Sequence, residues 1–148
     1  MGTSITLHVE VLVESTGKWV NYARYNPARY YRAFYQMAGI RGPYEDLTPR
    51  VPKGLPEDRS ELVRIAFGAD LDAHKPSWLS SDEIEDLRGC LDAAYDNDDT
   101  DLGWDLWLAG ARRSSQMVYA YLFNNGWHKR SLPDGLSDFR FVFWFDGE

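Results

Sequence analysis

The last stretch of the chain, residues 139–146, reads Phe-Arg-Phe-Val-Phe-Trp-Phe-Asp and is apolar on nearly both faces of an extended backbone. A segment with two apolar faces has to be covered on both of them, which predicts an interior strand of a sheet. An interior strand needs hydrogen-bonding neighbours on each side. The rest of the chain therefore has to supply a sheet around this segment.

The N-terminal segment provides the expected partner. Apolar residues at positions 5, 7, 9, 11 and 13 alternate with mostly polar ones, which is the period-two pattern of a strand with one buried face. On this pattern His8 points to the wetter side. Residues 15–18 include a glycine and predict a turn, and residues 19–23 predict the returning strand of a hairpin. We expect the C-terminal strand to pair with this hairpin.

Helix signals fill the middle of the chain. A helix is predicted over residues 26–38, because Asn-Pro opens it and Gly39 follows it. A second helix is predicted over residues 57–68, with acidic residues in its first turn. Its apolar face is expected to consist of Leu62, Ile65 and Ala66. Residues 104–122 indicate a further long helix or a pair of helices.

A third helix start is marked by Ser80 and Glu83, which stand in capping-box spacing. Such a start holds the preceding residues, His74, Ser77 and Trp78, on a rigid element. Taken together, these signals predict one α+β domain over residues 1–148. Its sheet, antiparallel or mixed, consists of the N-terminal hairpin and the C-terminal strand, with helices packed on it.

The composition is that of a folded protein. Hydrophobic residues make up 44% of the 148 and charged residues 26%, which argues against disorder of the whole chain. There is no apolar run long enough to span a bilayer and no signal peptide, so we expect a soluble, cytoplasmic protein. A net charge of −7 argues against binding of duplex nucleic acid as the main task.

Charge is unevenly distributed along the sequence. Residues 24–53 contain six basic and two acidic residues, whereas residues 82–105 contain ten acidic residues and one basic residue. The first stretch could attract anions and the second would repel them. The four prolines and two glycines of residues 42–56 predict an ordered extended loop across the surface, which is either functional or a structural strap.

Signals for metal binding and catalysis are weak. Asp70, Asp72 and His74 lie within five residues, but no second cluster completes a zinc ligand set. The common catalytic and phosphate-binding motifs are missing. A hydrolase would have to use His74 as general base, one of the two aspartates to orient it, and Ser77 as nucleophile. The single cysteine, Cys90, fits a helix interior. We expect no metal and no cofactor.

Five segments of the chain carry a resemblance: residues 29–34 (RYYRAF), 38–41 (AGIR), 53–58 (KGLPED), 74–80 (HKPSWLS) and 142–146 (VFWFD). In this order they resemble a family of small uncharacterised phage and bacterial proteins. Typical segments of that family are R-N-Y-x-L-F-x-x-L-A-x-V-R, P-R-G-L-P, H-S-H-S-W-L-T and V-F-W-F-D-N. The chain departs from the pattern at Tyr30, Lys53, Lys75-Pro76 and Gly147, and so lacks the family's second histidine. The resemblance implies a mobile-element origin and, for a phage protein, the host cytoplasm as its location.

Eight residues of the matching segments are expected to converge at one end of the sheet: Arg29, Tyr31, Arg41, Lys53, His74, Ser77, Trp78 and Asp146. Cations, hydroxyls and an aromatic plane suit an anionic, base-containing small molecule. The leading hypothesis is a non-catalytic binding protein that sequesters a nucleotide-like signal during phage infection, as counter-defence. One alternative is an acidic inhibitor of a host protein, which mimics nucleic acid through residues 82–105. A hydrolase that uses His74 is the third.

Overall fold

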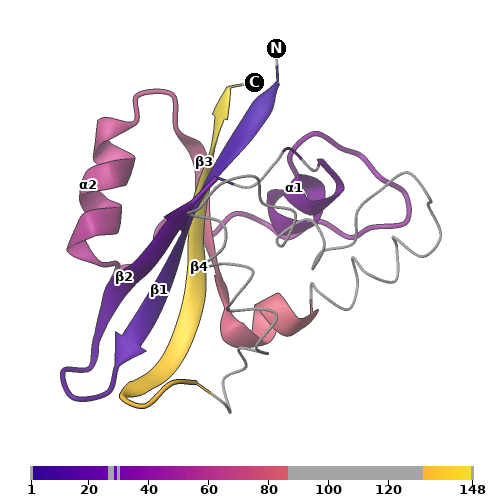
Figure 1. Cartoon of the computed structure of the whole chain (residues 1–148). Coiled ribbons are helices and arrows are strands. Elements are labelled where there is room, and N and C mark those ends of the chain that lie inside the picture. The colour runs from indigo at the N-terminus through magenta and orange to yellow at the C-terminus, as the bar shows by residue number, and fades with distance from the viewer. Residues whose placement is uncertain (1, 27–28, 30, 87–131, 148) are drawn as a thin grey trace.

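The structure, a computed structural model, describes residues 2–26, 29, 31–86 and 132–147. The elements in chain order are β1 (Thr3–Val13), β2 (Lys18–Tyr25), α1 (Tyr31–Ala38), α2 (Glu61–Ala69), β3 (His74–Ser80) and β4 (Leu136–Gly147). The strands form an antiparallel sheet in the order β2-β1-β4-β3, and the two helices lie on opposite faces of it (Figure 1). The predicted α+β fold and the N-terminal hairpin are confirmed.

β4 is an interior strand, as its two apolar faces predict. It pairs with β1 from Thr3↔Gly147 to Val13↔Leu136, and it pairs with β3 on its other side. Every residue from Phe139 to Phe145 is buried. The central position of β4 follows directly from the need to cover both of its faces.

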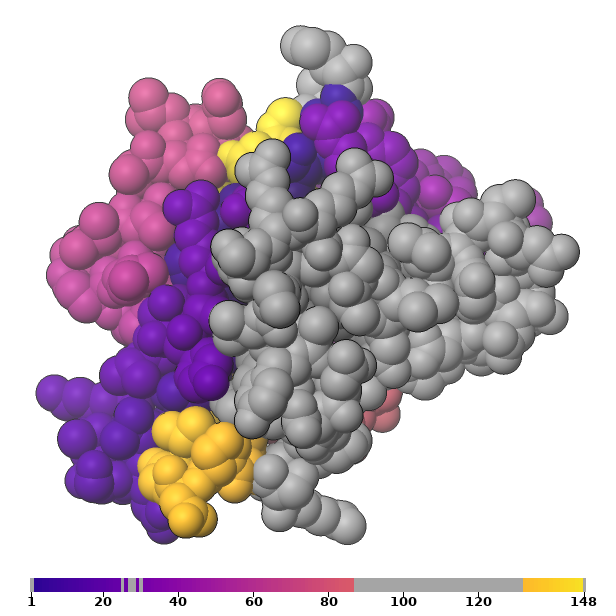
Figure 2. Space-filling view, in the orientation of Figure 1, coloured from indigo at the N-terminus to yellow at the C-terminus, as the bar shows by residue number. Residues whose placement is uncertain are grey.

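The two ends of the sheet differ in what they bring together. At one end, β1 begins and β4 ends, so that both chain termini lie there (Figure 1). At the other end, the β1–β2 turn lies beside the loop that precedes β4 (Figure 2), and Glu14 N donates a hydrogen bond to Gly135 O at 2.9 Å. Gly17 in the β1–β2 turn has a φ of +67°, which explains why a glycine stands there.

The face of the sheet toward α1 carries an apolar core. Alternate residues of β1 and β4 meet there, namely Ile5, Leu7, Val9, Val11, Phe139, Phe141, Phe143 and Phe145. From α1, Phe34 and Met37 pack onto them. The Phe34 and Phe145 rings meet edge to face, with their centroids 5.2 Å apart.

The opposite face of the sheet is also buried, so the prediction that His8 points to the wetter side is wrong. His8 is fully buried, and its ring stacks on Trp144 with the centroids 5.3 Å apart. Val63 of α2 packs onto Val142 and Trp144 and so covers this face. The alternating pattern identifies one apolar face, but it cannot show that a helix also covers the polar one.

α2 starts later than predicted and turns a different side to the sheet. Ser60 is its N-cap, and the Ser60 Oγ accepts a hydrogen bond from Val63 N at 3.3 Å. Val63 is fully buried, whereas Leu62 and Ile65 are 49% and 56% exposed. The predicted apolar face is therefore wrong at both of these residues: the helix turns Val63 to the sheet, and Val63 lies about 100° around the helix from Leu62. Ala66 does pack against the buried cluster.

Residues 74–80 form the edge strand β3, which the sequence analysis missed. β3 pairs with β4 at His74↔Phe145 and Ser77↔Phe143, with a register shift between the two pairs. The capping box at its end is confirmed. Ser80 N donates to Glu83 Oε1 at 3.0 Å, and Glu83 N donates to Ser80 Oγ at 3.2 Å.

The proline-rich loop over residues 42–56, which we call the strap, contains no helix or strand, as predicted. It runs along the outer edge of β3: Gly54 N donates to Pro76 O at 2.9 Å, and Lys53 N donates to Ser77 Oγ at 3.0 Å. Since an uncovered edge strand invites pairing with other chains, the strap protects β3.

Several predicted features lie outside the described residues: the start of the first helix at 27–28, most of the third helix, Cys90, the acidic segment beyond residue 86 and the helix or helices over 104–122. In the part of the chain that is described, helices are too short or too polar to cross a membrane.

Candidate functional site

The structure distributes the eight predicted site residues over three places: the crossing of the strap over β3 (Lys53, Ser77, Trp78), the end of the sheet near the termini (Arg29, Tyr31, Arg41, His74), and the α2 face (Asp146). The first place is concave, the second is an exposed group of hydrogen-bond donors, and the third is a pair of carboxyl groups. The fold does not gather all eight residues into one hollow.

The strap and β3 border a cleft of 220 Å³, which we call the strap cleft. Its walls include Met37, Arg50, Lys53, Ser77, Trp78 and Glu83. The local sequence explains this arrangement. Prolines keep the strap extended, and the hydrogen bonds of its Lys53 and Gly54 amides to β3 fix its distance from the strand.

One carboxylate organises the cations of the strap cleft. Glu83 Oε1 accepts a hydrogen bond from Lys53 Nζ at 2.6 Å, and Glu83 Oε2 accepts one from Arg50 Nη1 at 2.9 Å. Burial alone would raise the pKa of Glu83, but the bonds from Lys53 and Ser80 and the charge of Arg50 hold it below its usual range. Glu83 thus stays ionised and positions both cations.

Trp78 forms the aromatic wall beside these cations. Lys53 Nζ lies 3.6 Å from the centroid of the Trp78 ring, within the range of a cation–π interaction. Trp78 also packs against the buried cluster of Val63, Val142 and Trp144, which holds its ring on the α2 face.

Arg50 has an unused donor in this cleft. Its Nε is buried and has no hydrogen-bond partner among the residues that the structure describes. A buried N–H group without an acceptor costs free energy, so a ligand acceptor that came within reach through a shift of the Arg50 side chain would gain this hydrogen bond.

At the end of the sheet near the termini, Arg29, Tyr31 and Arg41 form a second group, which we call the terminal cluster. Arg29 Nη2 donates to Ser4 Oγ at 3.2 Å, and Arg41 Nη2 donates to Tyr31 Oη at 3.4 Å. The guanidinium of Arg41 also covers the Tyr31 ring, with 4.8 Å from Cζ to the ring centroid. His74 reaches the same end of the sheet through a hydrogen bond between its Nε2 and the carbonyl of Gly147.

Asp146 lies on the α2 face and shares a hydrogen bond with Asp70; we call these two residues the aspartate pair. Asp70 also accepts a hydrogen bond from Trp144 Nε1 at 3.1 Å, and Asp146 accepts one from Thr6 Oγ1 at 3.3 Å. Burial is the main cause that raises the pKa of Asp146 to about 6, and the bond and charge of Asp70 raise it further. The hydrogen bond with Asp146 lowers the pKa of Asp70. The two carboxyl groups therefore share one proton.

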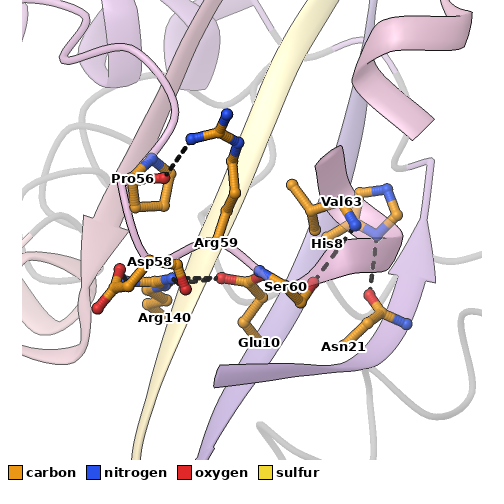
Figure 3. Close-up of polar contacts among 9 residues, drawn as sticks. All are labelled: His8, Glu10, Asn21, Pro56, Asp58, Arg59, Ser60, Val63 and Arg140. Carbon is orange, nitrogen blue, oxygen red and sulfur yellow. Dashed lines mark hydrogen bonds and ion pairs between the residues drawn. The ribbon is translucent and has the colours of Figure 1, made fainter. Parts of the chain in front are cut away.

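The sequence analysis missed an ion network of Glu10, Asp58 and Arg140, in which the side chains of Glu10 and Arg140 are buried and that of Asp58 is exposed (Figure 3). Arg140 Nε donates to Glu10 Oε1 at 2.8 Å, and its Nη1 donates to Asp58 Oδ1 at 2.8 Å. Glu10 Oε2 accepts a hydrogen bond from the N-cap amide of Ser60 at 2.7 Å. One signal was available in the sequence: an arginine in the middle of an otherwise apolar strand needs a buried anion.

This network contacts the Trp78 wall of the strap cleft through Arg140. Arg140 Cζ lies 4.0 Å from the centroid of the Trp19 ring and 5.7 Å from that of Trp78. Burial alone would raise the pKa of Asp58, but its hydrogen bond and ion pair with Arg140 hold it below its ordinary value. Because Asp58 lies two residues beyond the end of the strap, the network anchors this end as well as the Trp78 ring.

A hydrolase would have to combine the side chains of Ser77, His74 and Asp70, but each of them forms hydrogen bonds with other groups. Ser77 Oγ is buried and accepts the Lys53 amide, His74 bonds the carbonyl of Gly147, and Asp70 bonds Trp144 and Asp146. Among the contacts of the described residues, none joins two of these three side chains.

Within the described ranges, there is no group of three or more His, Cys, Asp or Glu side chains that could hold a metal ion. Comparison of the chain with protein-family models, with curated proteins and with solved structures gave no match. What the protein binds therefore has to be inferred from its own geometry.

Proposed function

We propose that the protein binds a small anionic molecule of the nucleotide-like class in the strap cleft and holds it without chemical change. The observation that carries this proposal is the pair of cations, Arg50 and Lys53, fixed by one carboxylate in a cleft where the Arg50 Nε has no partner among the described residues. Binding without turnover would act by sequestration, because it removes the molecule from solution.

The donors of the cleft support an anionic ligand. Glu83 takes one hydrogen bond from each cation, and it is itself held by the capping box to Ser80. The ammonium of Lys53 carries three protons and the guanidinium of Arg50 carries five, so donors remain for a second acceptor. Since Glu83 already orients both side chains, binding of a ligand costs little of their conformational entropy.

The cleft also has an apolar side that suits the base of a nucleotide. Met37 and Leu79 line it together with Trp78. Its 220 Å³ is below the roughly 300–1,000 Å³ of pockets that bury a drug-sized ligand. The ligand we propose is therefore no larger than a mononucleotide, and part of it stays in solvent.

Calorimetry with AMP, ADP, ATP and uncharged adenosine tests the proposal. We expect the nucleotides to bind and adenosine to bind at least about tenfold more weakly, since charge-assisted hydrogen bonds carry the affinity. Chromatography after incubation should return the nucleotide unchanged. Adenosine binding as tightly as AMP, or no binding of any nucleotide, would overturn the proposal, and a hydrolysed nucleotide would favour the hydrolase.

A pair of matched variants locates the site. Arg50→Gln should weaken nucleotide binding by about tenfold or more, because it removes one charge and the unused donor. Arg64→Gln is the control, because Arg64 is an exposed arginine of α2 that bonds Glu61 and does not line the cleft. Equal losses in the two variants would show that the affinity comes from the general charge of the protein and not from the strap cleft.

A further inference from the structure

The terminal cluster brings two guanidinium groups and a phenol to one exposed place. Arg29 precedes α1 and bonds Ser4 of β1, whereas Arg41 follows α1 and bonds the Tyr31 hydroxyl, which also accepts the Thr3 amide of β1. A methyl group in place of a hydrogen at Gly2 would collide with the Arg29 guanidinium and lie 2.8 Å from Tyr31 Oη. The two side chains thus touch the same point of the backbone. They come from separate segments, so the tertiary fold produces the convergence.

The hydroxyl group of Tyr31 has a proton without an acceptor in the described part of the chain. Its oxygen accepts one hydrogen bond from Thr3 N at 3.3 Å and another from Arg41 Nη2 at 3.4 Å. A phenol can accept two hydrogen bonds and donate one. With both acceptor positions engaged, Tyr31 presents a donor between two positive charges.

Two further observations point the same way. Arg41 has a φ of +65°, a left-handed conformation that costs a residue with a side chain of the order of 1–2 kcal/mol. The Arg41 guanidinium lies over the Tyr31 ring. The hydrogen bond from Arg41, together with the charges of Arg41 and Arg29, holds the pKa of Tyr31 below its usual range. The potential at the hydroxyl is therefore positive.

We propose that the terminal cluster is a binding site for an oxyanion of the phosphate class, which accepts hydrogen bonds from Arg29, Arg41 and the Tyr31 hydroxyl. Guanidinium groups match the geometry of phosphate oxygens, and three donors from three side chains can bind one tetrahedral anion. This site is separate from the strap cleft and does not depend on binding there. The oxyanion is either free phosphate or the phosphate group of a nucleotide.

Titration of the ¹⁵N-labelled protein with inorganic phosphate, and separately with AMP, tests the site. We expect the Nε–Hε signals of Arg29 and Arg41 to shift with saturation, while the signal of exposed Arg64 stays in place. Tyr31→Phe should weaken phosphate binding about fivefold or more, because it removes the donor but keeps the ring that packs on Phe34. Arg41→Gln should weaken it at least as much.

The outcomes distinguish a nucleotide from free phosphate as the source of the oxyanion, and they distinguish the terminal cluster from the strap cleft. AMP binding at least about tenfold tighter than phosphate at the terminal cluster would identify a nucleotide as the source of the oxyanion, and equal affinities would identify free phosphate. Arg50→Gln should leave the terminal cluster titration unchanged, so a failure of the strap cleft would not affect this result. If phosphate shifts Arg64 as much as Arg41, or if Tyr31→Phe binds phosphate as well as the unchanged protein, the proposed site does not exist.

Discussion

The two faces of the sheet are equally buried but chemically unlike. Toward α1, β1 and β4 present aliphatic and phenyl side chains. Toward α2, the same two strands present Thr6, His8, Glu10 and Arg140, each no more than 3% exposed. The difference shows that burial does not by itself decide polarity. A polar side chain can lie inside when its donors and acceptors meet partners that the fold brings to it.

The faces also differ in how tightly they constrain the structure. Packing of phenyl and aliphatic groups is non-directional, so similar side chains can replace one another there. The buried ion network is directional and joins residues that are 50, 82 and 130 positions apart in the chain. We infer that the α1 face supplies most of the driving force for folding, whereas the α2 face fixes where α2 and the end of the strap dock.

Removing the cation of the buried network should have the largest effect. In Arg140→Met the Glu10 carboxylate keeps its place in the interior, where it is fully buried, but loses its ion pair. Loss of one partner of such a pair lowers the free energy of unfolding by about 3–5 kcal/mol. Urea denaturation followed by circular dichroism measures the change.

A second substitution shows whether the loss comes from the unpaired charge. Glu10→Gln removes that charge and keeps an oxygen that can accept the Ser60 amide. We expect the double variant Glu10→Gln/Arg140→Met to be more stable than the sum of the two single losses predicts. Additive losses would contradict the directional role of the network. Arg140→Lys, which keeps the charge and loses the fork geometry, serves if Arg140→Met does not fold.

On the α1 face a change of shape should cost less. Phe143 is fully buried among phenyl and aliphatic groups, and Phe143→Leu keeps an apolar side chain of similar size. We expect a loss of no more than about 1.5 kcal/mol in the free energy of unfolding, measured by the same urea titration. A loss as large as that of Arg140→Met would show that the two faces are equally demanding.

The apolar half of this contrast was predictable from the sequence, because its signals are local. Alternation over residues 5–13 identifies the apolar face of β1, and the apolar run over residues 139–145, interrupted only by Arg140, identifies β4 as an interior strand. The hairpin turn and the capping box of Ser80 and Glu83 are likewise signalled within a few residues. Such features need no knowledge of distant parts of the chain.

The polar half could not be predicted in the same way. His8 was predicted on the wetter side because it is a polar residue in an alternating strand. The same pattern is also compatible with a polar residue that has a buried partner, and the sequence does not distinguish the two cases. Its ring neighbour, Trp144, is far away in sequence. The same limit applies to the eight predicted site residues. Asp146 shares a face with Trp144, whereas Ser77 pairs with Phe143 after the register shift that follows His74, so strand register separates them.

The aspartate pair gives the α2 face a dependence on pH that the α1 face lacks. The pKa of Asp146 is about 6 in the folded protein and 3.8 in an ordinary environment, so the folded state binds more protons between these values. Stability is then fully present below pH 3.8 and falls as the pH rises through 6. His8 acts with the opposite sign: burial, the main cause, lowers its pKa from 6.5, so protonation of the unfolded chain lowers stability as the pH falls below that value.

Comparing Asp146→Asn with the unchanged protein isolates the pair, because the contribution of His8 cancels in the difference. The asparagine cannot ionise, and its amide can donate to Asp70 as the protonated Asp146 does. The variant should match the protein near pH 4 and exceed its free energy of unfolding by about 1 kcal/mol at pH 7.5, a value reduced for the partial exposure of Asp146. Thermal unfolding at several pH values measures this difference. A difference that stays constant from pH 4 to 7.5 would mean that folding does not raise the pKa of Asp146, and the aspartate pair would then add no pH dependence to the α2 face.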